Sequence, residues 1–107
     1  MLAKYKYLLT YRYAEMIFEL NGEFCRRWVD RRSRTFDQMV QAGRSGKQNI
    51  VEAVGESDTT KKNEIKLLGI AKGSFEELLA DYEDFLRQRE FVTWTKDDLR
   101  VKAFRKT

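Results

Sequence analysis

The chain has 107 residues, of which 42% are apolar and 36% are charged, and this predicts one domain with a modest core and a strongly solvated surface. It has no His, no Pro and a single Cys, which excludes His-based catalytic triads, disulfide frameworks and Cys-based metal sites. Because no run of about 18 apolar residues is present and the start is interrupted by Arg12, we expect no membrane span or signal peptide, and a location in the reducing cytoplasm.

The first segment is predicted to be a helix over about residues 4–29. Alternating residues near its start are typical of a strand, but the longer window favours a helix with two apolar stripes. One stripe contains Tyr5, Leu9, Tyr13, Ile17, Leu20, Phe24 and Trp28; the other contains Tyr7, Tyr11, Ala14, Phe18 and Cys25. A helix that is apolar on two faces needs two covering partners. We expect the second to be either another copy of the chain or the rest of its own bundle.

A second helix is predicted over about residues 35–55. Thr35 to Gln38 fits a capping box with Thr35 as the N-cap residue. Gly55 is a natural stop because glycine adopts the left-handed conformation that ends many helices.

The strongest periodicity lies between Ile65 and Leu86, where apolar residues recur every three or four positions. It predicts a third helix over about residues 60–90, with its N-cap among Ser57, Asp58, Thr59 and Thr60. A fourth helix is predicted over about residues 95–106, beginning with a capping signature at Thr95 to Asp98. It is either short or cut off before its natural end.

Five glycines inside the predicted helices need a compensating interaction, because each costs about 0.5–1 kcal/mol relative to alanine. They are Gly22, Gly43, Gly46, Gly69 and Gly73, of which the last four are the candidates for close helix packing. The last two form a small-xxx-small pair, and Ala42 with Gly46 forms another. We therefore expect the second and third helices to pack closely at these positions.

Basic residues gather at the end of the first helix and along the second. The candidates for binding nucleic acid are Arg26, Arg27, Arg31, Arg32, Arg34, Arg44 and Lys47. Trp28 and Phe36 are interleaved with the arginines, and such a mixture suits phosphate contact and base stacking. A helix C-terminal cap followed by a solvated turn explains the same arginine run.

The segment Gly43 to Lys47 is a poor phosphate loop, since its glycine spacing is wrong and its context is helical. A nucleic-acid clamp of the KH type requires a sheet, which the sequence does not predict. Paired carboxylates such as Glu76 and Glu77 lack the His that bundle metal sites use, and Cys25 lacks a His partner. We therefore expect no enzyme activity, no metal and no cofactor.

The second and third helices resemble those of the four-helix-bundle proteins encoded in bacterial 23S rRNA intervening sequences. The run from Gln41 to Ala53 resembles the second-helix signature of that family, and Ile70 to Leu78 resembles its third-helix motif. The residues that match the signature in order are Arg44, Ser45, Asn49, Ile50, Glu52 and Gly55. The family's proline is missing, with Lys47 and Gln48 in that region, and the fourth helix is barely present.

The resemblance implies an up-down antiparallel four-helix bundle without enzyme activity, assembled as a ring-like homo-oligomer, with five chains as the expected number. A related branch, the accessory proteins of diversity-generating retroelements, is pentameric and basic, and it binds nucleic acid and a reverse transcriptase. RNA or DNA is therefore the expected partner, and the alternative is a scaffolding module that contacts only protein. The expected core contains Leu20, Phe24, Val40, Ile50, Val54, Leu68, Phe75, Leu79, Tyr82 and Leu86.

Overall fold

The computed structural model describes residues 4–55, 60–91, 95 and 97–106, and within these ranges all regular structure is helical. The helices are α1 (Lys4–Trp28), α2 (Arg34–Gly55), α3 (Lys61–Gln88) and α4 (Leu99–Lys106). The all-α class is therefore confirmed. The bounds of the three long helices lie close to the predicted ones, whereas α4 begins later than predicted. Over the described part of the chain, none of the helices combines the length and apolar character needed to cross a bilayer.

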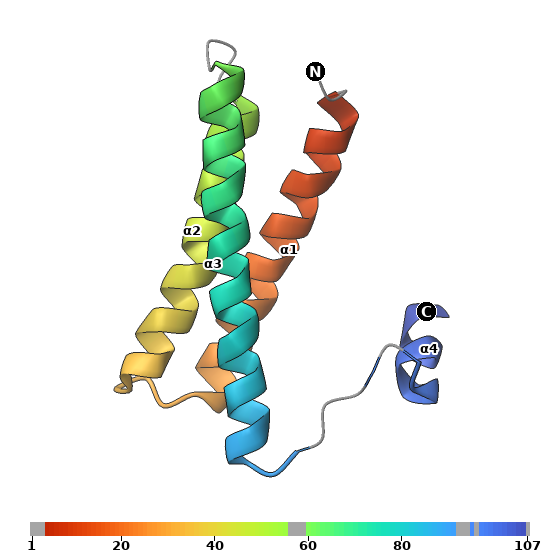
Figure 1. Cartoon of the computed structure of the whole chain (residues 1–107). Helices are drawn as coiled ribbons and strands as arrows, with labels where there is room; N and C mark the ends of the chain where they lie inside the picture. The colour runs from red at the N-terminus through yellow and green to blue at the C-terminus, as the bar shows by residue number, and fades with distance from the viewer. Residues whose placement is uncertain (1–3, 56–59, 92–94, 96, 107) are drawn as a thin grey trace.

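Helix α2 packs on both α1 and α3; in Figure 1 α3 lies in front of α2, with α1 to the right. The backbones of α1 and α3 do not approach each other closely, and α1 leans away from α3 toward its N-terminal end. Helix α4 stands apart and does not pack on any of the other three. The single chain therefore shows three packed helices, and the complete four-helix bundle remains a prediction.

The core consists of two clusters of mostly small side chains between α2 and its neighbours. One cluster contains Cys25, Met39, Ala42 and Leu78; the other contains Ala14, Ile50 and Ala71. Of the predicted core residues, Ile50 is buried and most of the others are half-buried. The prediction is wrong for Leu20 and Leu79, which are 66% and 59% exposed. Leu79 lines an open apolar groove between α1 and α3, and Leu20 lies on the same face of α1 as Tyr13 and Ile17, which also line it.

The two apolar stripes of α1 have different environments. Ala14 and Cys25 are buried against α2, and Tyr11 and Phe18 are half-buried on the same side. In the other stripe Phe24 is half-buried and its ring contacts Tyr82 and Phe85 of α3, whereas the remaining described members are exposed: Leu9, Tyr13, Ile17, Leu20 and Trp28. The side chains of Tyr5 and Tyr7 lie outside the described residues. The prediction that one face of α1 packs inside the chain is therefore confirmed.

Each of the last three helices begins at a side-chain cap. The Ser33 hydroxyl accepts a hydrogen bond from Phe36 N at 3.1 Å, so Ser33, and not the predicted Thr35, caps α2. Thr60 caps α3 by accepting from Asn63 N at 3.1 Å, as predicted; the other three candidates for this cap lie outside the described residues. Asp98 accepts from Arg100 N at 2.8 Å, which explains why α4 begins at Leu99.

The α2 cap can be tested by substitution. Ser33→Ala removes the acceptor for Phe36 N, and we expect it to lower the free energy of unfolding by about 1 kcal/mol. Thr35→Ala is the matched control. Thr35 lies inside α2, so this substitution should change the free energy of unfolding by only about a few tenths of 1 kcal/mol. Urea denaturation of both variants measures the difference. A larger loss for Thr35→Ala would show that the cap has been assigned to the wrong residue.

The four glycines fall into two pairs with different surroundings. A Cβ atom at Gly43 would lie 2.8 Å from Asn21 Nδ2 on α1, and one at Gly46 would lie 2.5 Å from the Phe75 ring on α3. At Gly69 and Gly73 a Cβ would meet no atom within 4 Å. In this chain, therefore, Gly43 and Gly46 allow close helix packing, but Gly69 and Gly73 do not contribute to the packing of α2 on α3.

Candidate nucleic-acid interface

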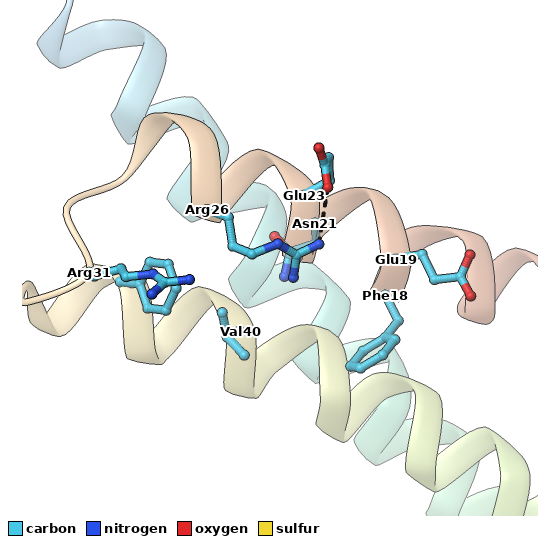
Figure 2. Close-up of a pocket in the computed structure, with 9 residues that line it drawn as sticks. Phe18, Glu19, Asn21, Glu23, Arg26, Arg31 and Val40 are labelled. Carbon is cyan, nitrogen blue, oxygen red and sulfur yellow. Dashed lines mark hydrogen bonds and ion pairs between the residues drawn. The ribbon is translucent and has the colours of Figure 1, made fainter.

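An open groove of about 780 Å³ runs between α1 and α2 (Figure 2). Its lining residues are Phe18, Glu19, Asn21, Gly22, Glu23, Arg26, Arg31, Phe36 and Val40. Two of the candidate arginines, Arg26 and Arg31, project along it from α1 and from the turn before α2. The groove therefore brings together positive charge and aromatic carbon.

Helical spacing explains why these residues share one groove. On α1, Phe18, Gly22 and Arg26 are four residues apart and so lie on one face. On α2, Phe36 and Val40 have the same spacing. Gly22 leaves space in which the Arg26 side chain lies, since a Cβ there would be 3.2 Å from Arg26 Nη1. The guanidinium of Arg26 is thereby held along the groove wall.

The floor of the groove is formed by Asn21, which is only 2% exposed. Its Nδ2 donates to the Met39 carbonyl oxygen on α2 at 2.8 Å. Its Oδ1 accepts from the Tyr82 hydroxyl on α3 at 2.7 Å and from the Cys25 thiol at 3.7 Å. Burial raises the pKa of Tyr82 to about 12, so its hydroxyl remains a donor at neutral pH. Asn21 thus links all three long helices directly beneath the groove.

Glu23 forms ion pairs with two arginines in the next turn of α1. Arg26 Nη2 lies 3.1 Å from Glu23 Oε2, and Arg27 Nε lies 2.7 Å from Glu23 Oε1. The hydrogen bond from Arg26 and then the charge of Arg27 hold the pKa of Glu23 below its usual value. Of these two arginines, Arg26 lines the groove and Arg27 does not. The pair Arg26 and Arg27 therefore provides a natural comparison between a groove residue and its neighbour.

The turn at residues 29–33 positions the remaining arginines of the run. Asp30 Oδ1 accepts from Arg32 N at 3.0 Å, and the Ser33 hydroxyl donates to the Asp30 carbonyl oxygen at 2.6 Å. Arg31 reaches the groove, whereas Arg32 and Arg34 are exposed outside it. The structure therefore places the five arginines of the run on more than one surface.

Lys47 and Arg44 extend the positive charge along α2. The Lys47 ammonium lies 4.6 Å from the centre of the Phe18 ring, in a cation–π contact. Arg44 is exposed between Val40 and Lys47 on the same face of α2, given their spacing of four and three residues. Four of the seven predicted basic residues thus lie in or beside this groove: Arg26, Arg31, Arg44 and Lys47.

Sequence reasoning identified the arginines but missed other groove residues. Trp28, predicted as a stacking partner, is exposed away from the groove, whereas Phe36 lines it. Phe18, Gly22 and Val40 were not expected in the site. The sequence signal for Phe18 and Gly22 was their four-residue spacing with Arg26. For Val40 it was the four-residue spacing with Phe36.

Basic and aromatic side chains also meet near the end of α3, where the Arg89 guanidinium lies 3.5 Å from the centre of the Phe85 ring. A groove between α2 and α3 carries Asp37, Glu77 and Asp81, and burial raises the pKa of Asp81, assisted by nearby Asp84 and Glu77. Within the described ranges, no three His, Cys, Asp or Glu side chains lie close enough together to hold a metal ion. Residues 43–47 are in the middle of α2, which excludes both a phosphate loop and a clamp loop there.

No protein-family model, curated protein or solved structure matches this chain. The resemblance to the proteins of the 23S rRNA intervening sequences therefore continues to rest on the residues quoted above.

Proposed function

We propose that the chain is a non-enzymatic nucleic-acid-binding protein and that unpaired RNA or DNA lies along the groove between α1 and α2. The observation that carries this proposal is the presence of Arg26, Arg31, Phe18 and Phe36 in one groove of about 780 Å³. Arginine and lysine neutralise phosphates, and aromatic rings stack on bases that are free of a duplex. Lys47 and Arg44 would contact the strand further along α2.

The groove lining contains two basic residues, Arg26 and Arg31, and two acidic residues, Glu19 and Glu23, while Arg44 and Lys47 beside it add positive charge. The chain has a net charge of +4, and residues 1–35 alone contain eight basic and four acidic residues. Glu19 and Glu23 are the acidic residues that line the groove, and Glu23 is already paired with Arg26 and Arg27. A phosphate would compete with Glu23 for Arg26, so we expect binding that weakens steeply with salt.

The test is fluorescence anisotropy with a labelled single-stranded RNA across a series of salt concentrations. Replacing both Arg26 and Arg31 by Gln should weaken binding at low salt at least tenfold. It should also flatten the slope of log affinity against log salt by about 1–2. Arg27→Gln is the matched control, because Arg27 also pairs with Glu23 but does not line the groove. Equal losses for both variants, or no binding by the native chain at low salt, would contradict the proposal.

The proposal retains the four-helix bundle and the homo-oligomer that the resemblance implies, with five chains as the number to be tested. It also retains a cytoplasmic location. Exposed apolar side chains on α1 and α3 support self-association. The unpaired Cys25 agrees with a reducing compartment.

The same exposed apolar side chains favour a second candidate, a scaffolding module that contacts only protein. This candidate predicts that an assembly survives the combined loss of Arg26, Arg27, Arg31 and Arg32. Purification from cells that recovers one protein and no RNA would support it over nucleic-acid binding.

A further inference from the structure

Three glutamates follow one another along α1 at intervals of four residues and so form one row on the helix: Glu15, Glu19 and Glu23. The outer two have partners within the chain. The Tyr11 hydroxyl donates to Glu15 Oε2 at 3.0 Å, and Arg26 Nη2 lies 3.1 Å from Glu23 Oε2. Glu19, in the middle, has no ion pair or side-chain hydrogen bond within the part of the chain that the structure describes.

Glu19 is exposed and lines the groove between α1 and α2, next to the Phe18 ring in Figure 2. Contacts on either side of it fix its level along α2. The Phe18 ring has the Lys47 ammonium 4.6 Å from its centre, and Asn21 Nδ2 lies 2.8 Å from where a Cβ of Gly43 would be. Glu19 is therefore at the level of the α2 segment that runs from Gly43 to Lys47.

The two walls of the groove carry opposite charge at this level. On α2 the basic residues are Arg44 and Lys47, and neither of them forms an ion pair with Glu19 on α1. A strand that lies between the walls would place its phosphates against α2 and its bases toward α1. Because a carboxylate repels phosphate, the free carboxylate of Glu19 favours binding only if it accepts hydrogen bonds from a base.

The chemistry of a carboxylate selects among the bases. Its two oxygens lie side by side and can only accept hydrogen bonds. Guanine offers two adjacent donors on its Watson–Crick edge, N1–H and the 2-amino group, so it can pair with both oxygens at once. Adenine and cytosine have a ring nitrogen acceptor beside the amino group, and uracil and thymine have carbonyl oxygens on both sides of N3–H. The Watson–Crick edge of guanine is free for such contacts in an unpaired strand.

We propose that Glu19 determines the base specificity of the groove and that it selects unpaired guanine. Its carboxylate accepts hydrogen bonds from guanine N1–H and the 2-amino group, while Arg44 and Lys47 contact the neighbouring phosphates. The inference rests on the proposed function, because it requires nucleic acid in this groove. It adds a residue that reads sequence, whereas contacts to phosphate carry no sequence information directly.

The first test compares labelled single-stranded RNAs by fluorescence anisotropy at low salt. One strand contains only uridine, and the others carry a single central guanosine, adenosine, cytidine or inosine. We expect guanosine to strengthen binding by the native chain at least about fivefold relative to uridine. Inosine, which keeps N1–H but lacks the 2-amino group, should lose most of this gain.

The outcomes of this comparison separate the inference from the proposed function. Equal binding of the guanosine and uridine strands would overturn the inference and leave the proposed function standing. A larger gain from adenosine or cytidine than from guanosine would do the same. If the native chain binds none of the strands, both the proposed function and the inference are wrong.

The second test assigns the preference to Glu19. Glu19→Gln should abolish the gain from guanosine but should not weaken binding of the uridine strand, because it removes a negative charge from beside the phosphates. Glu15→Gln is the matched control: it removes the same charge one turn away, outside the groove, and should keep the preference. A preference that survives in Glu19→Gln, or that both variants lose equally, would overturn the assignment. So would a loss of affinity for both strands in Glu19→Gln with a lower thermal midpoint, which would indicate a structural role instead.

Discussion

Asn21→Leu is expected to lower the free energy of unfolding by about 3 kcal/mol, because it removes hydrogen bonds that join helices and leaves their partners unpaired. Leucine has the same number and branching of side-chain heavy atoms, but it cannot accept from the Tyr82 hydroxyl or donate to the Met39 carbonyl oxygen. The hydroxyl of the half-buried Tyr82 would lose its partner, and a donor left without a partner away from water costs more than the bond itself contributes. Urea denaturation monitored by circular dichroism measures the loss.

Two further variants show whether the effect comes from the link between helices. Asn49→Ala removes hydrogen bonds from Asn49 to Ser45 within α2 only, and should cost less than about 1 kcal/mol. Tyr82→Phe should cost about 1–2 kcal/mol by itself but little when Asn21 is already leucine. Strictly additive losses in the double variant would show that the bond between these side chains contributes nothing.

Gly46→Ala is expected to lower the free energy of unfolding by about 2 kcal/mol, although alanine favours helix over glycine. The new Cβ would lie 2.5 Å from two carbons of the Phe75 ring, so the ring or helix α3 must move. Phe75 packs against the cluster of Ala14, Ile50 and Ala71, and its displacement would loosen that cluster. Thermal unfolding followed by circular dichroism should show a lower midpoint.

Gly69→Ala is the matched control for this substitution. It lies in the interior of α3 with no atom within 4 Å of the new Cβ, so only the helix propensity changes. We expect a gain of about 0.5–1 kcal/mol. If both variants gained stability, the close approach of α2 and α3 at Gly46 would be wrong.

The sequence predicted the helices well because apolar spacing and caps are local signals. Thr60 was among the predicted caps, but Ser33 was missed because Thr35 with Gln38 fits a capping box, whereas Phe36 stands three residues after Ser33. Leu20 and Leu79 were assigned to the core because periodicity identifies an apolar face without identifying what covers it. Likewise, small-xxx-small spacing could not show that Gly46 meets Phe75 while Gly73 meets open space.

The candidate site was predictable in its charges but not in its shape. The arginine run identified Arg26 and Arg31, since charge density is visible in the sequence. Whether Arg26 or Arg27 lines the groove depends on how α1 is rotated about its axis relative to α2. Contacts such as those of Asn21 and Gly43 fix that rotation. Those contacts join residues far apart in the sequence and leave no local pattern.

The two largest fully buried side chains, Met39 and Cys25, both contain sulfur and lie where α1 meets α2. Burial raises the pKa of the Cys25 thiol, so the reactive thiolate is both rare and shielded while the helices stay together. A thiol reagent gains access only when α1 separates from α2. Cys25 is therefore a native reporter of local opening, and its labelling rate gives the frequency of that motion without any added probe.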